Sequence, residues 1–292
     1  MSSGMIDILM ITYNRAEYTR LSLSRLLDTC DDSCRVWIWQ NGNDPETLQT
    51  VSEWRDHPRV YRYHHSAENR KLRDPSNWLL SESDGDYVSK VDDDCLVPDG
   101  WLETLREAHI REPRLGAVAC WHFLPEDYLS EVAAKKILKM SDGLRVMCHP
   151  WVGGSGFLLK RACVDRVGLI SKRESGITGY FLRIARAGWT NGWLFPFLYQ
   201  EHMDDPRAPH TMIRSDDDLR RHLPLSAKNF GSDSLSKWEA QLRRSAVRIQ
   251  AMPSEVEYYN PIRQAVRKRL QRLFPAFDDP AHKYIQALKS QS

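Results

Sequence analysis

The sequence lacks several features that would point to whole classes of protein. It has no run of 18 apolar residues, the length that a helix needs to cross a bilayer. Its first residues, Met1-Ser2-Ser3-Gly4, show no basic stretch followed by an apolar one, so a secretory signal is not expected. None of the six cysteines forms a Cys-x-x-Cys pair, which argues against a zinc knuckle. We therefore predict reduced thiols and a cytoplasmic location.

The chain also lacks an excess of one charge. Lysine and arginine number 41 against 39 aspartates and glutamates, a formal net charge of +2, so nucleic acid is not the expected substrate. The length of 292 residues and the hydrophobic content of 41% allow one large packed domain, or one domain with an appendage. Ten tryptophans and eleven tyrosines are many for this length. They supply core bulk or platforms for sugar rings and nucleobases.

Strand and helix patterns alternate through the first 120 residues. The expected strands are 6–11, 35–40, 60–63, 87–91 and 116–121, and the expected helices are 16–27, one that begins at Pro45, 77–81 and 100–111, with Asp99 as a cap for the last. This alternation favours an α/β fold with a mainly parallel sheet that is covered by helices on both faces.

The second half of the chain has a different pattern. Residues 151–159 are typical of a glycine-rich strand, and glycines inside a strand mark the close approach of a ligand or another backbone. Helices are expected at 161–167 and 180–187, and another apolar run covers 192–199. After residue 215 the pattern is helical. We therefore divide the chain into a domain of residues 1–215 and a helical extension of residues 216–292.

Asp92, Asp93 and Asp94 follow the fourth expected strand directly. Three adjacent carboxylates repel one another unless a cation or hydrogen-bond donors offset their charge. Ligands bind at the carboxyl ends of parallel strands, and hard oxygen ligands there suit Mg²⁺ or Mn²⁺. The alternative is a solvated acidic turn.

Four motifs, this one included, follow one another in an order that resembles the family-two glycosyltransferases. They are Thr12-Tyr13-Asn14-Arg15 after the first strand, Asn41-Gly42-Asn43-Asp44 after the second, Asp92-x-Asp94 with Pro98 and Trp101-Leu102, and Gly153-Gly154-Ser155-Gly156-Phe157 with Lys160 and Arg161. The resemblance extends from about residue 6 to about residue 188. Each motif alone is weak, and their shared order is what carries the resemblance.

The resemblance implies a GT-A fold and a metal-dependent glycosyltransferase. Such an enzyme moves a sugar from a nucleoside-diphosphate sugar to an acceptor hydroxyl, with Mn²⁺ or Mg²⁺ as cofactor, in glycan, glycoconjugate or natural-product biosynthesis. Residues 1–120 would bind the nucleotide sugar and residues 121–215 the acceptor, which could be a glycan, a lipid-linked or a small molecule.

The resemblance also implies roles for single residues. Thr12, Tyr13 and Arg15 would line the nucleobase pocket, and Asn41 and Asp44 would lie at the base or ribose. Asp92 and Asp93 would lie against the nucleotide sugar. Asp94 would ligate the metal, and Asp92 would contact it through water. Asn69, Lys71 and Arg73 could approach the diphosphate, or could form an exposed basic loop. Trp151, Gly153 and Gly154 would contact the acceptor.

A histidine from a late segment completes the metal site in many GT-A enzymes. His202 and His210 are the candidates, and His202 is favoured. The alternative is a surface loop with solvated charges.

The catalytic base is displaced from the family's usual position. The acidic pair expected ahead of Arg183 falls on Gly176 and Ile177, which cannot accept a proton. Glu174 is the nearest carboxylate and the candidate base for an inverting reaction. A retaining reaction needs no such base, so the stereochemistry stays open.

Two other functions compete with glycosyl transfer. A nucleotidyltransferase would carry a glycine-rich phosphate loop after the first strand, and this chain has no glycine there. A non-catalytic sugar-binding or scaffold protein of the same fold would fit the displaced base, but it would not need the three aspartates.

Residues 261–292 are basic and amphipathic. Ile262, Val266, Leu270 and Leu273 share one helical face, and Arg263, Arg267, Lys268, Arg269 and Arg272 fill much of the rest. Such a helix can lie on an anionic membrane, or it can dock its apolar face on its own domain or on a second subunit. We expect docking, because it is the commoner fate of such helices.

Overall fold

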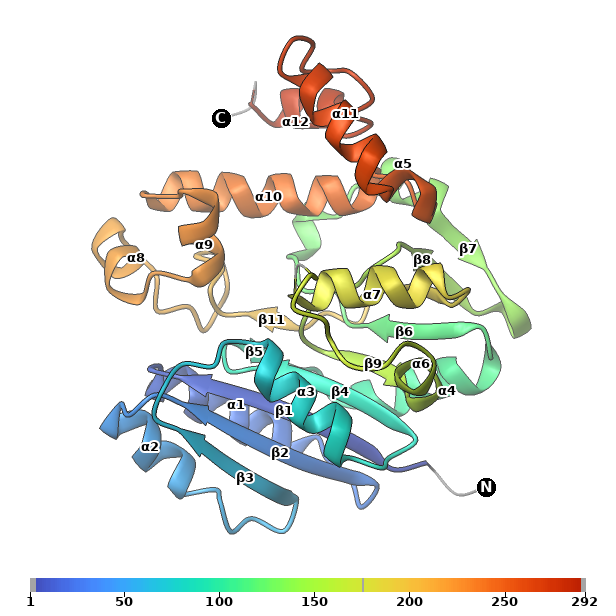
Figure 1. Cartoon of the computed structure of the whole chain (residues 1–292). Coiled ribbons are helices and arrows are strands. Elements are labelled where there is room, and N and C mark those ends of the chain that lie inside the picture. The colour runs from blue at the N-terminus through green and yellow to red at the C-terminus, as the bar shows by residue number, and fades with distance from the viewer. Residues whose placement is uncertain (1–3, 175, 290–292) are drawn as a thin grey trace.

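A nine-stranded sheet forms the centre of the computed structural model, which describes residues 4–174 and 176–289 (Figure 1). Its order is β3-β2-β1-β4-β9-β6-β10-β8-β7. The strands are β1 (Ile6–Tyr13), β2 (Cys34–Asn41), β3 (Val60–Ser66), β4 (Tyr87–Asp92), β6 (Leu115–Ala119), β7 (Ile137–Lys139), β8 (Arg145–Cys148), β9 (Phe157–Lys160) and β10 (Thr190–Phe195). A separate antiparallel ribbon pairs β5 (Cys95–Leu96) with β11 (Glu201–His202).

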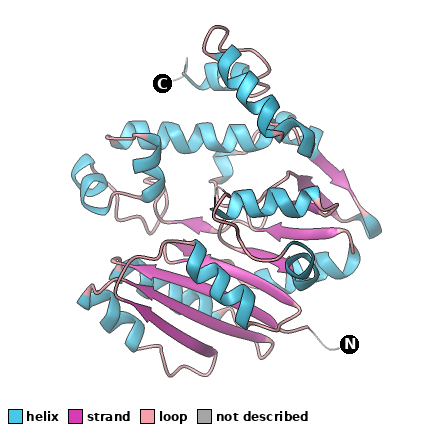
Figure 2. Ribbon diagram, in the orientation of Figure 1, coloured by secondary structure: helices cyan, strands magenta, loops and turns pink. Residues whose placement is uncertain are grey.

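Helices lie on both faces of the sheet (Figure 2). They are α1 (Ala16–Asp28), α2 (Pro45–Ser52), α3 (Arg73–Glu82), α4 (Trp101–Arg111), α5 (Ser130–Ala133), α6 (Arg161–Val167) and α7 (Gly176–Arg186), followed by α8 (Asp216–His222), α9 (Leu225–Phe230), α10 (Leu235–Ala251), α11 (Pro261–Gln271) and α12 (His282–Lys289). The α/β fold class predicted from the alternating pattern is confirmed.

Strands β3, β2, β1 and β4 are parallel, and their register aligns the motifs. Tyr13 pairs with Asn41, and Ile11 pairs with Asp92. Parallel strands present their carboxyl ends at one edge, so the first three motifs gather at that edge. Beyond β4 the sheet is mixed, because β9 is antiparallel to both β4 and β6.

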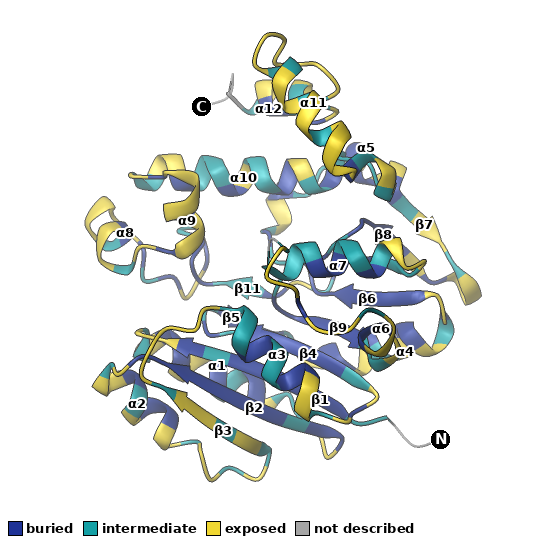
Figure 3. Ribbon diagram, viewed as in Figure 1, coloured by how far each residue is buried: buried dark blue, intermediate teal, exposed yellow. Residues whose placement is uncertain are grey.

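Each face of the sheet packs against its own set of helices. Ile6, Ile8 and Met10 of β1 point to the core under α1, α2 and α4, whereas Leu9 points to the core under α3, α6 and α7. This alternation follows from the period of two in a strand, and burial on both faces explains why β1 is apolar almost throughout (Figure 3). Five of the tryptophans are completely buried and form core bulk: Trp37, Trp101, Trp121, Trp193 and Trp238.

Two local predictions were wrong. Asp99 does not cap α4, because Gly100 occupies the cap position in a left-handed conformation and Asp99 instead pairs with Arg25. The strand expected at 151–159 begins only at Phe157. The preceding loop ends at Gly156, where φ is +64° and a Cβ atom would lie 1.8 Å from Oε1 of Gln200, so only glycine fits.

The described residues after 215 form helices and connections without a strand, and α10 packs against α5 and α12 (Figure 1). Residues 1–3, which bear on the signal expectation, and 290–292, at the end of the basic tail, lie outside the described residues. Within the described part, no helix has the length and apolarity needed to span a membrane.

Lys136 ties the sheet domain to α10 and gives a testable pH dependence. Its buried Nζ donates to the carbonyl oxygen of Ile249 at 2.6 Å, and burial lowers its pKa from 10.5 to about 7, although Cys148 and Glu255 oppose the shift. The unfolded chain therefore binds more protons than the folded chain above pH 7. We expect the free energy of unfolding to rise with pH from 7 to 9, by up to about 1.4 kcal/mol per unit relative to Lys136→Met. Urea unfolding of the wild type and of Lys136→Met at pH 7 and pH 9 tests this. An equal change of the free energy of unfolding with pH in the two proteins would contradict it.

Candidate active site

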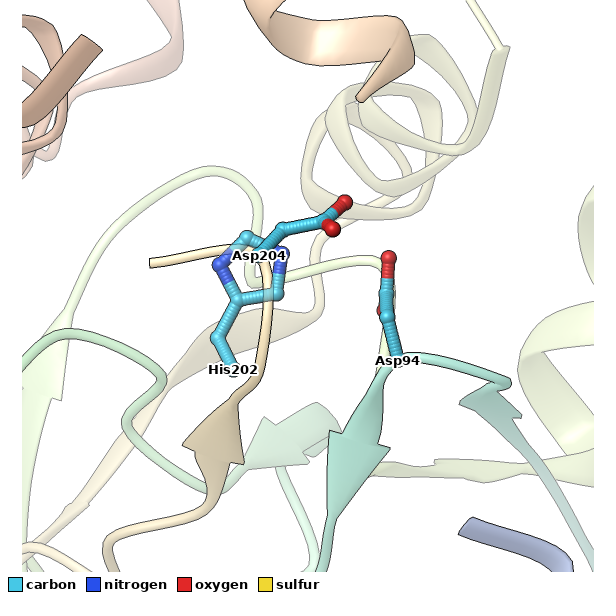
Figure 4. Close-up of side chains that lie close together, drawn as sticks. All are labelled: Asp94, His202 and Asp204. Carbon is cyan, nitrogen blue, oxygen red and sulfur yellow. The ribbon is translucent and has the colours of Figure 1, made fainter. Parts of the chain in front are cut away.

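Three side chains from two distant segments converge beside the carboxyl edge of the parallel strands. Asp94, His202 and Asp204 each offer a ligand atom, and these atoms lie within 4.8 Å of one another (Figure 4). Asp94 lies in the turn between β4 and β5, and His202 ends β11. The pairing of Cys95 with His202 and the bond from the Met203 amide to the Asp94 carbonyl, 2.8 Å, hold the two segments together.

Arg15 neutralises the two carboxylates of this cluster. Its Nη1 lies 3.0 Å from Oδ2 of Asp94, and its Nη2 lies 2.7 Å from Oδ1 of Asp204. The guanidinium therefore faces the acidic cluster, and a contact of Arg15 with a nucleobase stays a prediction. The interaction also fixes the turn after β1 against the segment that carries His202 and Asp204.

The two carboxyl groups differ in their electrostatic setting. Burial and the charge of Asp94 raise the pKa of Asp204 to about 6, although Arg15 opposes the shift. Burial would also raise the pKa of Asp94, but the positive charges of His202 and Arg15 prevail and lower it to about 2. The cluster thus keeps Asp94 ionised.

The donor set fits a divalent cation. Two carboxylates and one imidazole are donors that Mn²⁺ accepts, and carboxylates also suit Mg²⁺. Asp204, which the sequence analysis did not select, is the member that completes the set. Asp204 lies two residues after His202, in the turn that follows β11, and a turn of this kind leaves no periodic pattern in the sequence.

Asp92 and Asp93 have other partners. Asp92 accepts from Nζ of the buried Lys90, and its amide donates to Oγ of Ser155 at 3.0 Å. Its carboxylate lies outside the three-residue group, and a contact of Asp92 with the metal through water stays a prediction.

Asp93 points under the turn that follows β1. Its Oδ2 accepts from the Tyr13 amide at 3.1 Å, and burial raises its pKa to about 8 against the influence of Arg15. The buried carboxyl group therefore supports the backbone of Tyr13, and a contact of Asp93 with a nucleotide sugar stays a prediction.

The first two motifs form the wall next to the cluster. Thr12 is buried and its hydroxyl bonds to Gln40, whereas Tyr13 is exposed, and a contact of Thr12 with a nucleobase stays a prediction. Asn41 is also buried, and its Oδ1 accepts from the indole of Trp39 and the amide of Arg70, both at 3.0 Å.

Asn41 thereby anchors the loop that carries three of the other candidates. Oδ1 of Asn69 accepts from the Lys71 amide at 2.8 Å, Lys71 is exposed, and Arg73 lies 3.4 Å from Asp74. Asp44 caps α2 by accepting from the amide and hydroxyl of Thr47, at 2.8 and 2.6 Å. Contacts of Tyr13, Asp44, Lys71 and Arg73 with a nucleotide sugar remain predictions.

The acceptor candidates have close neighbours of their own. The ring of Trp151 packs against His149 and Tyr259, with centroids 4.2 and 4.6 Å away. A Cβ on Gly153 would lie 2.9 Å from Nδ1 of His122, and one on Gly154 would lie 3.2 Å from Ile177. These glycines make room for side chains of this chain, and contact with an acceptor remains a prediction.

His122 is a further group that sequence reasoning missed. Its ring centroid lies 6.3 Å from that of His202, and burial together with His202 lowers its pKa to about 3. Its buried Nδ1 has no hydrogen-bond partner among the described residues. A neutral imidazole therefore lies behind His202.

His210 lies on the other side of the β5–β11 ribbon. Its Nδ1 contacts Oε2 of Glu201 at 2.9 Å, and its amide donates to Oε1 of the same residue at 2.7 Å. Neighbouring residues of a strand face opposite sides, so Glu201 and its partner are directed away from the side of His202. The assignment of His210 to the metal site was wrong.

Glu174 is engaged in an ion pair. Its carboxylate accepts from Nε and Nη2 of Arg183 at 2.8 and 3.1 Å and from the Ser171 amide at 2.7 Å. Arg183 also donates to the carbonyl oxygens of Val167 and Leu169. Glu174 thus closes the loop between α6 and α7, and this placement contradicts its assignment as a free catalytic base.

The two late histidines make a matched pair for an experiment. We expect His202→Ala to weaken nucleotide affinity at least about tenfold more with Mn²⁺ than without it, because the variant loses an imidazole ligand. His210→Ala is the control and should leave the difference in nucleotide affinity with and without Mn²⁺ as it is in the wild type. Calorimetric titration of nucleoside diphosphates measures both. Equal weakening of the His202 variant under the two conditions would remove His202 from the metal site.

Comparisons with known proteins concern the family and the fold of this chain. Residues 7–151 match the sequence profile of glycosyl transferase family 2. The mannosyltransferase PcManGT from Pyrobaculum calidifontis, solved in complex with GDP-Man and Mn²⁺, is similar with a TM-score of 0.58 and 16% identity over 97% of this chain and 83% of that one. GalNAc-T7, solved with UDP, GalNAc and Mn²⁺, gives a TM-score of 0.52 and 10% identity over 68% of this chain and 44% of that one. The predicted GT-A fold and the resemblance to family two are confirmed.

Proposed function

From the glycosyl transferase family 2 pattern of residues 7–151, we propose that this chain is a metal-dependent glycosyltransferase. It moves a sugar from a nucleoside-diphosphate sugar to an acceptor hydroxyl. The observation that carries the proposal is the convergence of Asp94, His202 and Asp204 at the carboxyl edge of the parallel strands. The Mn²⁺ in both similar structures supports it, as do their GDP-Man and UDP ligands.

Different residues of this chain would bind different parts of the donor. Asp94, His202 and Asp204 would hold Mn²⁺ or Mg²⁺, which when bound neutralises the charge of a diphosphate leaving group. Arg15 bridges two of these ligands and keeps them in place. Tyr13 and Asp44 lie on the base side, and Lys71 and Arg73 supply positive charge on the loop next to Asn41. Catalysis would rest on positioning and electrostatic stabilisation.

We propose inversion at the anomeric carbon, in keeping with the inverting family that the motifs resemble. Glu174 is not offered as the base because Arg183 occupies its carboxylate. Proton NMR of the fresh product reports the anomeric configuration, and a retained configuration would refute inversion without touching the assignment of the metal ligands.

A screen of nucleotide sugars tests the activity itself. We expect metal-dependent release of a nucleoside diphosphate that stops on addition of a chelator. Release of pyrophosphate would instead indicate a nucleotidyltransferase. Nucleotide binding without turnover on any donor would favour a non-catalytic sugar-binding protein. The acceptor class, whether a glycan, a lipid-linked or a small molecule, follows from the product.

The proposed site of action is a reducing compartment such as the cytoplasm. All six cysteines are free thiols, and five of them are buried in the core. Buried thiols need no oxidising environment to be stable.

A further inference from the structure

Large apolar side chains are exposed on α11 and on the turn that follows it. Ile262 is 76% exposed, Leu273 71% and Phe274 63%, and Val266 and Phe277 are also exposed. We call these five residues the C-terminal patch. They fall within 16 consecutive residues, whereas solvent-facing apolar residues on most surfaces occur singly. Figure 3 shows α11 as a largely exposed helix at the end of the molecule away from β1–β3.

Polar contacts of Arg267 and Gln271 hold α11 in place, and the C-terminal patch stays exposed to solvent. The guanidinium of Arg267 lies 3.4 Å from the ring centroid of Tyr258, and its Nε lies 2.6 Å from Oδ2 of Asp278. Nη2 of Arg267 also donates to the Tyr258 carbonyl at 3.1 Å, and Nε2 of Gln271 donates to that of Phe277 at 2.9 Å. The expectation that α11 docks its apolar face on its own domain was therefore wrong.

Positive charges surround the patch. Arg263, Lys268, Arg269 and Arg272 are exposed, and none of their side chains has an ion pair in the described part of the chain. At 100° per residue, Ile262 and Val266 fall within an arc of roughly 40° on α11, and Leu273 lies in the turn that follows the helix. Arg269 adjoins that arc, Lys268 and Arg272 lie further round on the same side, and Arg263 lies on the other. An apolar stripe between cationic flanks is the arrangement by which helices lie in a membrane interface.

We propose that the C-terminal patch binds the surface of an anionic lipid bilayer. The apolar side chains would enter the boundary between headgroups and acyl chains, and the four unpaired cations would contact anionic headgroups. Each cation near such a surface raises the affinity about fivefold. The contact is reversible and weakens with salt, because exposed charges are screened.

A second copy of the chain fits the patch less well. A twofold interface brings the same surface of both subunits together. It would bury the apolar stripes, but it would also oppose the four unpaired cations of one subunit to those of the other. An anionic bilayer satisfies both the apolar and the charged side chains.

Co-sedimentation of the full chain with vesicles tests the proposal and does not depend on glycosyl transfer. Pelleting is expected with phosphatidylcholine vesicles that contain phosphatidylserine, and not with phosphatidylcholine alone. High salt should reduce it. The triple variant Ile262→Ser, Leu273→Ser, Phe274→Ser should weaken binding at least tenfold. Since these side chains are exposed, the fold should be retained, as circular dichroism can verify.

Leu225→Ser is the matched control, because Leu225 is also a highly exposed leucine but lies on α9, outside the patch. It should pellet like the wild type. Pelleting of the triple variant at the wild-type level, or no pelleting of the wild type at low salt, would overturn the proposal. A dimer in light scattering that the triple variant abolishes would likewise overturn it and give the patch to a second copy.

Discussion

Asp94→Ala is expected to abolish sugar transfer and Mn²⁺-dependent nucleotide binding while the fold stays intact. Asp94 is the ionised carboxylate of the cluster, and neither His202 nor Asp204 can replace the oxygen that it supplies. Loss of an outer-shell partner costs up to about a hundredfold in metal affinity, and loss of a ligand should cost at least as much. Nucleotide titration with and without Mn²⁺ measures the effect.

The stability of this variant should change little. Removal of the Asp94 carboxylate takes away one bond to Arg15, but it also relieves the repulsion between Asp94 and the buried Asp204. We expect the free energy of unfolding to stay within about 1 kcal/mol of the wild type. Asp99→Ala is the control, because its carboxylate is 89% exposed and lies outside the cluster. Wild-type turnover by Asp94→Ala would show the metal assignment to be wrong.

The part of the site that the sequence predicts is local. Asp94 could be selected because it follows a strand directly, and β1 and β2 end in motifs of their own. Once strands are recognised as parallel neighbours, their carboxyl ends must meet. The same reasoning predicts the sheet around β1 to β4, because long apolar strands leave few alternatives.

The positions of His202 and Asp204 in the site depend on contacts that leave no periodic pattern in the sequence. Strands β5 and β11 have two residues each, too short for a pattern, and their pairing, together with the ion pairs of Arg15, brings His202 and Asp204 to Asp94. The choice between His202 and His210 had the same difficulty. It rests on which side of a two-residue strand each group lies, and the sequence around them does not specify that pairing.

Glu174 and α11 show a second limit. An acidic residue near an expected position is indistinguishable in sequence from one that pairs with Arg183 nine residues later. The helical period predicts that Ile262, Val266 and Leu273 share a face, but the period does not reveal which face is docked. The contact between Arg267 and Tyr258 decides that, and it depends on tertiary structure.

Trp238→Ala is expected to have the largest effect on stability and to weaken the metal site as well. The indole of Trp238 is buried against Ile213, Leu219 and Leu242, and its Nε1 donates to the carbonyl oxygen of Asp204 at 2.7 Å. The residue thus joins the C-terminal extension to the backbone of Asp204, a candidate metal ligand. Truncation of a buried aromatic residue to alanine costs about 3–5 kcal/mol. Urea unfolding measures this loss.

Trp238→Phe separates the hydrogen bond from the packing. It keeps an aromatic ring in the cluster, so the cost in stability should be smaller than for alanine, but the Asp204 carbonyl loses its donor. An unpaired buried acceptor costs about 1–3 kcal/mol, and the segment can relax to recover that cost by moving toward water. Such a movement would displace Asp204 from Asp94 and His202. We therefore expect Mn²⁺ affinity to fall severalfold in Trp238→Phe under conditions where the protein is fully folded.

Trp101→Phe is the matched control for this variant. Trp101 is also completely buried, and its Nε1 donates to Oγ1 of Thr29 at 3.2 Å, but it lies in the core under α1, α2 and α4. Both phenylalanine variants should lose comparable stability, and only Trp238→Phe should lose Mn²⁺ affinity. An equal loss of affinity in the two would mean that general destabilisation lowers metal binding. An unchanged affinity in Trp238→Phe would mean that the β5–β11 pairing alone holds Asp204 in place, without help from the extension.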